Sequence, residues 1–141
     1  MKVYTDTSFF VSLYIQDSHS AEAHVLLAIR PDLWLTPLHA AEFAHAIAQQ
    51  VFLGKASLAT ADRVHDDLTQ DRKMGLWIET SIPDFAVDVC ADLGRRHGPK
   101  LGVRTLDTLH VACALELQAQ QFWTFDDRQK KLAKALGLKT N

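Results

Sequence analysis

The sequence predicts a single α/β domain, residues 1–141, in which a mostly parallel sheet of about five strands has helices on both faces. Its length of 141 residues suits one compact domain. Its composition, 48% apolar and 23% charged, is that of a globular protein and excludes a disordered, collagen-like or coiled-coil chain. Short apolar runs alternate with longer helical stretches, which is typical of a parallel sheet whose crossovers are helices.

Each element has its own local signal. The strands are expected at short β-prone or apolar runs: residues 3–5, 33–35, 76–78, 122–124 and 138–139. The helices are expected at residues 9–15 and 18–29, from Pro37 to Gly54, after Ser57, from Pro83 to a loop at 98–102, after Thr105, and at 126–136. The apolar faces of the two helices that flank that loop are expected to be buried: Phe85, Val89 and Leu93 in one, and Leu106, Leu109, Cys113 and Leu117 in the other.

Helix starts are indicated by side chains that can accept hydrogen bonds from free backbone N–H groups. Thr36 stands before Pro37, which gives an N-cap followed by proline at the first helical position. Ser8, Ser57 and Thr105 are expected to cap their helices in the same way.

The start of the chain and the cysteines indicate a cytoplasmic protein. Asp6 puts a carboxylate where a signal peptide needs apolar residues, and the longest apolar runs are too short to span a bilayer. Cys90 and Cys113 form no C-x-x-C pair, so both are expected to be reduced and buried. We expect no association with a membrane.

Four acidic residues are expected to meet at one edge of the sheet. Asp6 ends the first strand, Glu42 lies in the second turn of the helix after the second strand, and Asp126 directly follows the fourth strand. Asp107 begins a helix that precedes a strand. Because such a helix runs antiparallel to the strand it feeds, its start lies at the carboxyl edge, where the sites of parallel sheets form.

Each acid also has a purely structural interpretation. Asp126 with Gln129 resembles a capping box, Asp107 in a first helical turn interacts favourably with the helix dipole, and Glu42 could simply be solvated. Asp6 is harder to explain in this way, because an unpaired charge at the end of a buried strand is costly.

The chemistry of four convergent carboxylates favours hard divalent cations. Without cations the carboxylates would repel one another and resist ionisation. All-oxygen ligands suit Mg²⁺ or Mn²⁺ rather than zinc. Two such ions would leave a neutral site able to accept a phosphate, as in two-metal phosphoryl chemistry.

With these motifs the sequence resembles the PIN domain and, within it, the VapC-type ribonuclease toxins of prokaryotic toxin–antitoxin pairs. The resemblance rests on four segments in this order: residues 4–8 (Tyr-Thr-Asp-Thr-Ser), 41–43 (Ala-Glu-Phe), 104–112 (Arg-Thr-Leu-Asp-Thr-Leu-His-Val-Ala) and 123–128 (Trp-Thr-Phe-Asp-Asp-Arg). It implies a single PIN-like domain with a three-layer α/β/α fold and strand order 3-2-1-4-5. It also implies Mg²⁺- or Mn²⁺-dependent cleavage of RNA, and a homodimer held inactive by a small antitoxin.

The resemblance also implies roles for residues. Asp6, Glu42, Asp107 and Asp126 match the four acids of the family. Ser8 and Thr124 match positions of small hydroxyls beside the metals, and Asp127 either assists the fourth acid or only starts its helix. We expect Asp6 and Asp107 to ligate the stronger ion directly, and Glu42 and Asp126 to complete a second, weaker site or to act through waters. One ion would activate the attacking water and the other would stabilise the leaving oxygen, giving a 3′-hydroxyl and a 5′-phosphate.

The charge distribution indicates where RNA would lie. The formal net charge is −2, yet residues 1–94 carry 6 basic and 13 acidic side chains, and residues 95–141 carry 9 basic and 4 acidic. The basic second part could face a polyanion. The candidates for phosphate contacts are Arg95, Arg96, Lys100, Arg104 and Arg128, with Lys130 and Lys131, unless they form only a solvated surface.

Other interpretations remain beside this one. His39 and His45 diverge by about 120° on a helix and suit zinc poorly, and His110 is expected to be packed or to lie just behind the ligands. A dehalogenase-type phosphatase needs a second aspartate where Ser8 stands, and a receiver domain needs an acidic pair after the first strand. The open alternatives are a PIN-domain nuclease in RNA processing without a toxin role, and a non-catalytic PIN-like binding module.

Overall fold

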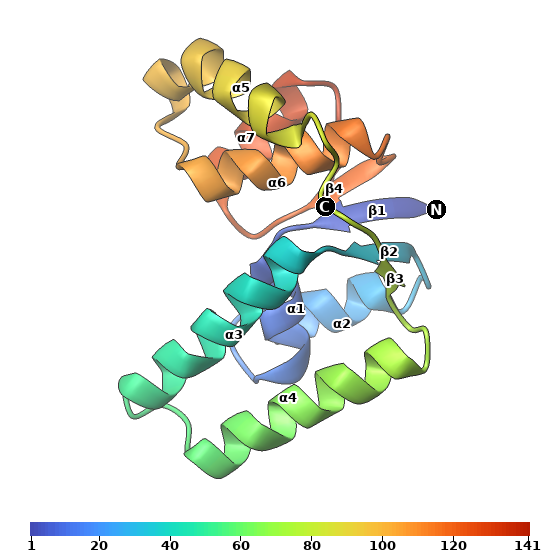
Figure 1. Cartoon of the computed structure of the whole chain (residues 1–141), viewed down its shortest axis with the longest axis vertical. Coiled ribbons are helices and arrows are strands. Elements are labelled where there is room, and N and C mark those ends of the chain that lie inside the picture. The colour runs from blue at the N-terminus through green and yellow to red at the C-terminus, as the bar shows by residue number, and fades with distance from the viewer.

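The computed structural model describes all residues, 1–141, and confirms the expected α/β/α fold (Figure 1). Its five strands are β1 Lys2–Thr5, β2 Asp32–Leu35, β3 Ile78–Glu79, β4 Gln121–Trp123 and β5 Lys139–Thr140. They lie in the order β3-β2-β1-β4-β5, and every neighbouring pair is parallel. The strand order implied by the resemblance is therefore confirmed.

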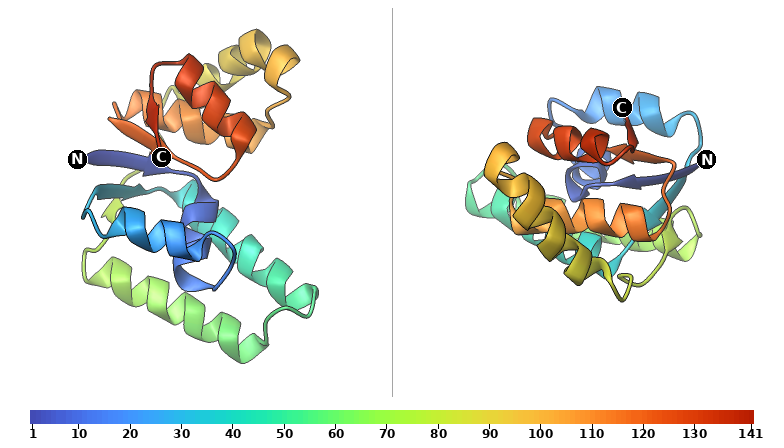
Figure 2. Two further views of the ribbon diagram at one scale, coloured as in Figure 1. Left: turned by 180° about the vertical axis from the view of Figure 1, so that it is seen from behind. Right: turned by 90° about the horizontal axis from the view of Figure 1, so that it is seen from above.

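The helices form two groups that cover opposite faces of the sheet. They are α1 Thr7–Tyr14, α2 Ser20–Leu27, α3 Pro37–Phe52, α4 Leu58–Lys73, α5 Ala86–Leu101, α6 Thr105–Glu116 and α7 Asp127–Ala135. Figure 2, seen from behind, shows α1–α4 on one side of the strands and α5–α7 on the other. None of the helices is both long enough and apolar enough to cross a membrane.

Alternation along the strands divides the core into two parts. Val3 and Trp123 pack with the side chains of α1, α3 and α4, whereas their neighbours Tyr4 and Phe122 pack with α6 and α7. Successive side chains of a strand point to opposite faces, so each short strand contributes to both clusters. Cys90 and Cys113 are free and buried, as expected.

Two of the expected helix caps are confirmed and two are wrong. Thr36 and His39 form a reciprocal capping box at the start of α3, and the Ser57 hydroxyl accepts from the backbone N–H of Thr60. Ser8 and Thr105 lie inside α1 and α6, whose N-cap residues are Asp6 and Arg104. The Ser8 hydroxyl instead donates to the Asp6 carboxylate, which makes it part of the candidate site.

The expected loop at residues 98–102 is wrong, because α5 continues through Pro99 to Leu101. The ring of Pro99 has a helical φ and removes one backbone donor, a local cost of about 3 kcal/mol. Burial of Cys90 and Leu93 against α6 outweighs this cost. The helix ends where Gly102 takes a φ of 61°, a left-handed conformation that glycine adopts without strain.

Two residues expected to face inward are exposed. The side chain of Phe85 is 67% exposed because α5 begins only at Ala86, leaving Phe85 before the first turn. Leu106 is 48% exposed because it lies in the first turn of α6, before the buried part of that helix, whereas Cys113 on the same face is in the core. The third strand is also shorter than expected, and its edge residues Ile78 and Glu79 are exposed.

The buried His39 makes stability depend on pH. Its Nε2 donates to the Thr5 carbonyl at 2.9 Å, and its Nδ1 accepts from the Thr36 N–H at 3.0 Å. Burial, reinforced by the charge of nearby His110, lowers the pKa of His39 from 6.5 to about 3. His39 is therefore protonated below about pH 6.5 in the unfolded chain, but only below about pH 3 in the folded chain.

We predict that lowering the pH from 7 to 5 costs about 2 kcal/mol of unfolding free energy through His39. Urea denaturation of the wild type and of His39→Gln at both pH values measures it. The variant should be less stable at pH 7 but should lose less stability on acidification. Equal losses in the two proteins would show that His39 does not cause the pH dependence.

Candidate functional site

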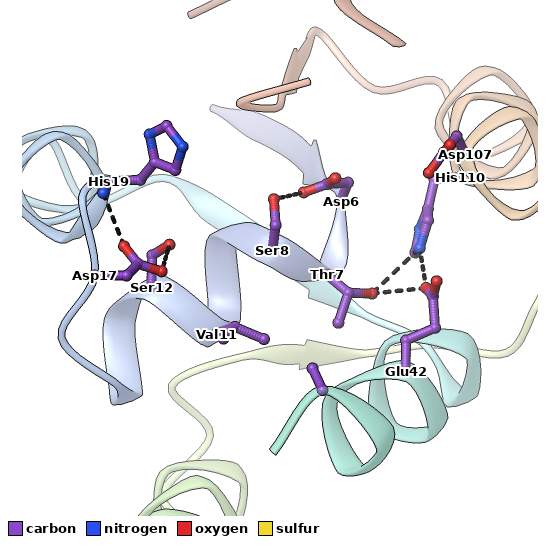
Figure 3. A pocket seen from close by; sticks show the side chains of 11 residues that line it. Asp6, Thr7, Ser8, Val11, Ser12, Asp17, His19, Glu42, Asp107 and His110 are labelled. Carbon is purple, nitrogen blue, oxygen red and sulfur yellow. Dashed lines mark hydrogen bonds and ion pairs between the residues drawn. The ribbon is translucent and has the colours of Figure 1, made fainter. Parts of the chain in front are cut away.

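The structure brings the four predicted acids to the carboxyl edge of the sheet, around two adjoining pockets. One pocket, of about 290 Å³, is lined by Asp6, Glu42 and Asp107 (Figure 3). The second, of about 270 Å³, is lined by Asp6, Asp107 and Asp126. Asp6 and Asp107 therefore border both pockets, with Glu42 on one side and Asp126 on the other.

Asp6 is the most buried of the four acids, with 8% of its surface exposed. It follows the central strand β1 and serves as the N-cap residue of α1 without a side-chain capping bond. Burial raises the pKa of its carboxyl above the ordinary value; the Ser8 hydroxyl, 2.5 Å away, and the charge of His110 offset part of this effect. The negative charge of Asp107 acts in the same direction as burial. The contacts that Asp6 makes within this chain therefore do not fully offset the cost of burying its ionised carboxylate.

Glu42 is held by a buried network that the sequence did not predict. Its Oε1 accepts a hydrogen bond from the Thr7 hydroxyl at 2.8 Å and pairs with the Nε2 of His110. The other ring nitrogen of His110 lies 3.1 Å from the Tyr4 hydroxyl. Burial by itself raises the pKa of Glu42, but the hydrogen bond and charge of His110, together with the Thr7 hydroxyl, outweigh it and hold the pKa below its ordinary value. His110 therefore lies directly behind an acid, one of the two positions expected for it.

Asp107 lies in the first turn of α6 and pairs with Arg104, whose Nε is 2.9 Å from Oδ2. The Arg104 side chain is 79% exposed, so this ion pair is worth at most about 1 kcal/mol. Arg104 also lines the second pocket. Of the basic residues predicted to contact RNA phosphates, Arg104 is the one that lies beside the four acids.

The other basic candidates lie outside both pockets. Arg95, Arg96 and Lys100 are exposed on α5, and Arg96 pairs with Asp92 at 2.7 Å. Arg128 donates to the carbonyl of Gly102 at 3.3 Å, in the segment that leads to Arg104. Lys130 and Lys131 on α7 do not line either pocket.

Asp126 and Asp127 have different environments. Oδ1 of Asp126 accepts from the Gln129 N–H at 2.8 Å and caps α7, as its structural interpretation expects, but its side chain also lines the second pocket. Asp127 is the first residue of α7, is exposed, and lines neither pocket. The geometry therefore favours Asp126 as the acid that acts in the site.

Thr124 contacts the backbone N–H of the fourth acid, Asp126, and not the Asp126 carboxylate. The buried Thr124 hydroxyl accepts from the Asp126 N–H at 3.0 Å and donates to Oε1 of Gln129 at 2.6 Å. The amide of Gln129 then donates to the Asp107 carbonyl at 2.9 Å. This chain of hydrogen bonds fixes the start of α7 relative to the start of α6, and so positions two of the acids.

The donor set fits a hard divalent cation, although no three acidic, histidine or cysteine side chains are gathered closely enough to hold one as they stand. Three of the acids are partly engaged: Glu42 by His110, Asp107 by Arg104, and Asp126 by its helix cap. All donors facing the pockets from these acids are oxygens, which Mg²⁺ and Mn²⁺ prefer. The undercompensated charge of buried Asp6 is what a bound cation would neutralise.

Comparisons with known proteins agree with this fold. The family model of the PIN domain matches residues 3–135. Similar solved structures include VapC20 of Mycobacterium tuberculosis, a sarcin-ricin loop cleaving toxin (15% identity; TM-score 0.71; 92% of this chain and 93% of that one). Others are FitAcB of Neisseria gonorrhoeae (14%; 0.73; 98% and 95%) and VapBC2 of Rickettsia felis bound to a DNA fragment from their promoter (14%; 0.68; 100% and 98%). No curated protein sequence matches the chain.

The buried charge of Asp6 gives a prediction about stability. Because burial raises the pKa of Asp6, its ionised form destabilises the folded chain near neutral pH. In a chelating buffer at pH 7, Asp6→Asn should melt a few degrees above the wild type, and the gain should shrink as the pH falls toward 4. Asp127→Asn is the matched control and should show no such gain. A lower melting temperature for Asp6→Asn at pH 7 would contradict this assignment.

Proposed function

We propose that this chain, which belongs to the PIN-domain family, is a Mg²⁺- or Mn²⁺-dependent endoribonuclease and the toxin of a toxin–antitoxin pair. The observation that carries the proposal is the convergence of four carboxylates on two adjoining pockets, with Asp6 and Asp107 shared by both. A non-catalytic binding module would have no need for a buried acid such as Asp6 in an unfavourable state. The proposed RNA substrate implies action in the cytoplasm.

The carboxylates would hold the cations according to the pockets that they border. Asp6 and Asp107 would ligate the more tightly bound ion, while Glu42 and Asp126, one on each side, would complete a second site or act through water. When bound, such ions activate water for attack on a phosphodiester and neutralise charge on the leaving oxygen.

The neighbouring side chains would keep these acids ionised and in place. His110 and Thr7 both contact Oε1 of Glu42, and its other oxygen makes no hydrogen bond within the chain. The Ser8 hydroxyl orients Asp6 in the same way. These contacts favour the charged forms that cation binding requires.

RNA would approach from the side of Arg104. Its exposed pair with Asp107 is weak, so a cation bound by Asp107 would release the guanidinium to bind a phosphate of the substrate. Arg128 lies near Arg104, because its guanidinium donates a hydrogen bond to the carbonyl of Gly102, two residues before Arg104. Arg95, Arg96 and Lys100 would contact only a longer RNA, because they lie away from the pockets on α5.

The assignment of the fourth acid is tested by two neighbouring substitutions. Asp126→Asn keeps an oxygen that can cap α7 but removes the charge that faces the pocket, so it should lower cleavage of a random-sequence RNA pool in Mn²⁺ by well over tenfold. Asp127→Asn should leave cleavage nearly intact and cost about 0.3–1 kcal/mol of stability through the helix dipole.

Circular dichroism of both variants checks that each one is folded. If Asp127→Asn is the inactive protein, the fourth acid is misassigned by one residue. If both variants remain fully active, Asp126 is not part of the catalytic set.

The toxin role predicts a small protein partner. A basic segment of an antitoxin would enter the acidic pockets, because guanidinium groups pair well with carboxylates. Exposed apolar side chains on and beside the N-terminal helices would contribute the rest of the interface; they include Val25, Ile29, Phe52 and Leu58. At the start of α5, Phe85 and Val87 are exposed and available to a second copy of this chain in the proposed homodimer.

Expression of the chain with its neighbouring reading frames should therefore yield a co-purifying small protein, and expression alone should slow growth. Asp6→Asn expressed alone should restore normal growth. If the wild-type chain alone neither slows growth nor recruits a partner, the toxin role is wrong, and a role in RNA processing would then account for any cleavage in vitro.

A further inference from the structure

We propose that His19 and Phe125 form a stacking platform for a nucleobase of the substrate, directly beside the carboxylates. This inference rests on the proposed function, since it assigns a further contact between RNA and the same site. Phe125 belongs to the segment at residues 123–128, but no local pattern relates it to His19, because 106 positions separate the two residues.

The two rings are stacked almost perfectly. Their centroids are 4.3 Å apart and their planes differ by 4°. Phe125 in turn stacks on Phe9, at 6.1 Å and 18°, and Phe9 is fully buried in the core. The three rings thus form a column that starts inside the protein and ends at the surface with His19.

The outer end of this column lies at the site. His19 lines both pockets, and Phe125 lines the second pocket together with Asp126 and Arg104. Figure 3 shows the His19 ring at the rim of the first pocket, on the side opposite Glu42. A nucleotide whose phosphate sits at the acids would therefore have its base within reach of this ring.

The loop before α2 holds His19 in position. The carboxylate of Asp17 accepts hydrogen bonds from the Ser12 hydroxyl and from the backbone N–H of His19, both at 2.8 Å. The His19 residue is exposed, its ring has Phe125 as its one stacking partner, and its ring nitrogens make no hydrogen bond within the chain. One face of the imidazole is thus packed and the other is available to a ligand.

A nucleobase suits this feature better than another ligand. Every base has a flat π surface, and stacking on aromatic side chains is a general means of binding single-stranded RNA. The acidic pockets would take up the phosphate through cations, so the neighbouring flat aromatic surface is left for the base. The contact would add affinity without requiring a particular base.

The test measures cleavage of a fluorescent random-sequence RNA 12-mer in Mn²⁺ by the full chain. His19→Ala should raise KM about 5- to 100-fold, the equivalent of losing one stacked base, with a smaller effect on kcat. His19→Phe should stay within about twofold of the wild type, because it restores a ring. His24→Ala, a histidine on α2 that lines neither pocket, is the matched control and should not change KM.

A 12-mer of abasic nucleotides, used as a competitor, separates stacking from contacts to the backbone. It should inhibit the wild type and His19→Ala equally, because it has no base to stack. An unchanged KM for His19→Ala, equal loss in His19→Ala and His19→Phe, or weaker abasic inhibition of His19→Ala would each overturn the platform. If His19→Ala leaves KM unchanged but no longer binds a co-purifying protein, the His19 ring contacts that protein and the platform is likewise overturned. If the wild type cleaves no RNA at all, the proposed function fails first.

Discussion

The candidate site depends on a buried carboxylate at the end of the central strand. Asp6 lies between β1 and α1, and it and its neighbours Thr5 and Thr7 are buried. Its charge is costly there, because burial outweighs the Ser8 hydroxyl and the nearby histidine. The surrounding contacts each limit the accumulation of negative charge: His110 pairs with Glu42, Arg104 pairs with Asp107, and the start of α7 takes one oxygen of Asp126.

Topology explains why the four acids meet although 120 residues separate the first from the last. The strand order puts β1 in the middle, with β2 and β4 on either side, so the residues that follow all three strands share one edge. The start of α6 reaches the same edge from the opposite direction. Gln129 and Thr124 then join α7 to the Asp107 carbonyl, so that two acids on separate helices keep a fixed relation.

Much of this arrangement could be predicted from the sequence because its signals are local. Thr36 and Ser57 are caps with a clear pattern, and alternation of short strands with helices leads to a parallel sheet and hence to the shared edge. The failures are tertiary in origin. The continuation of α5 through Pro99 depends on packing against α6, which no local rule includes. The pairing of His110 with Glu42, and of His19 with Phe125, joins residues far apart in the chain, and only the folded structure shows them.

A calorimetric titration of the metal-free chain with MnCl₂, for the wild type and for Asp6→Asn, tests the cation site most directly. We expect saturable binding to the wild type and at least tenfold weaker binding to Asp6→Asn. Manganese at a hundred times its dissociation constant should also stabilise the wild-type fold by about 2.7 kcal/mol. Absence of saturable binding up to millimolar Mn²⁺, or equal affinity in the two proteins, would contradict the assignment of the acidic rim as a cation site.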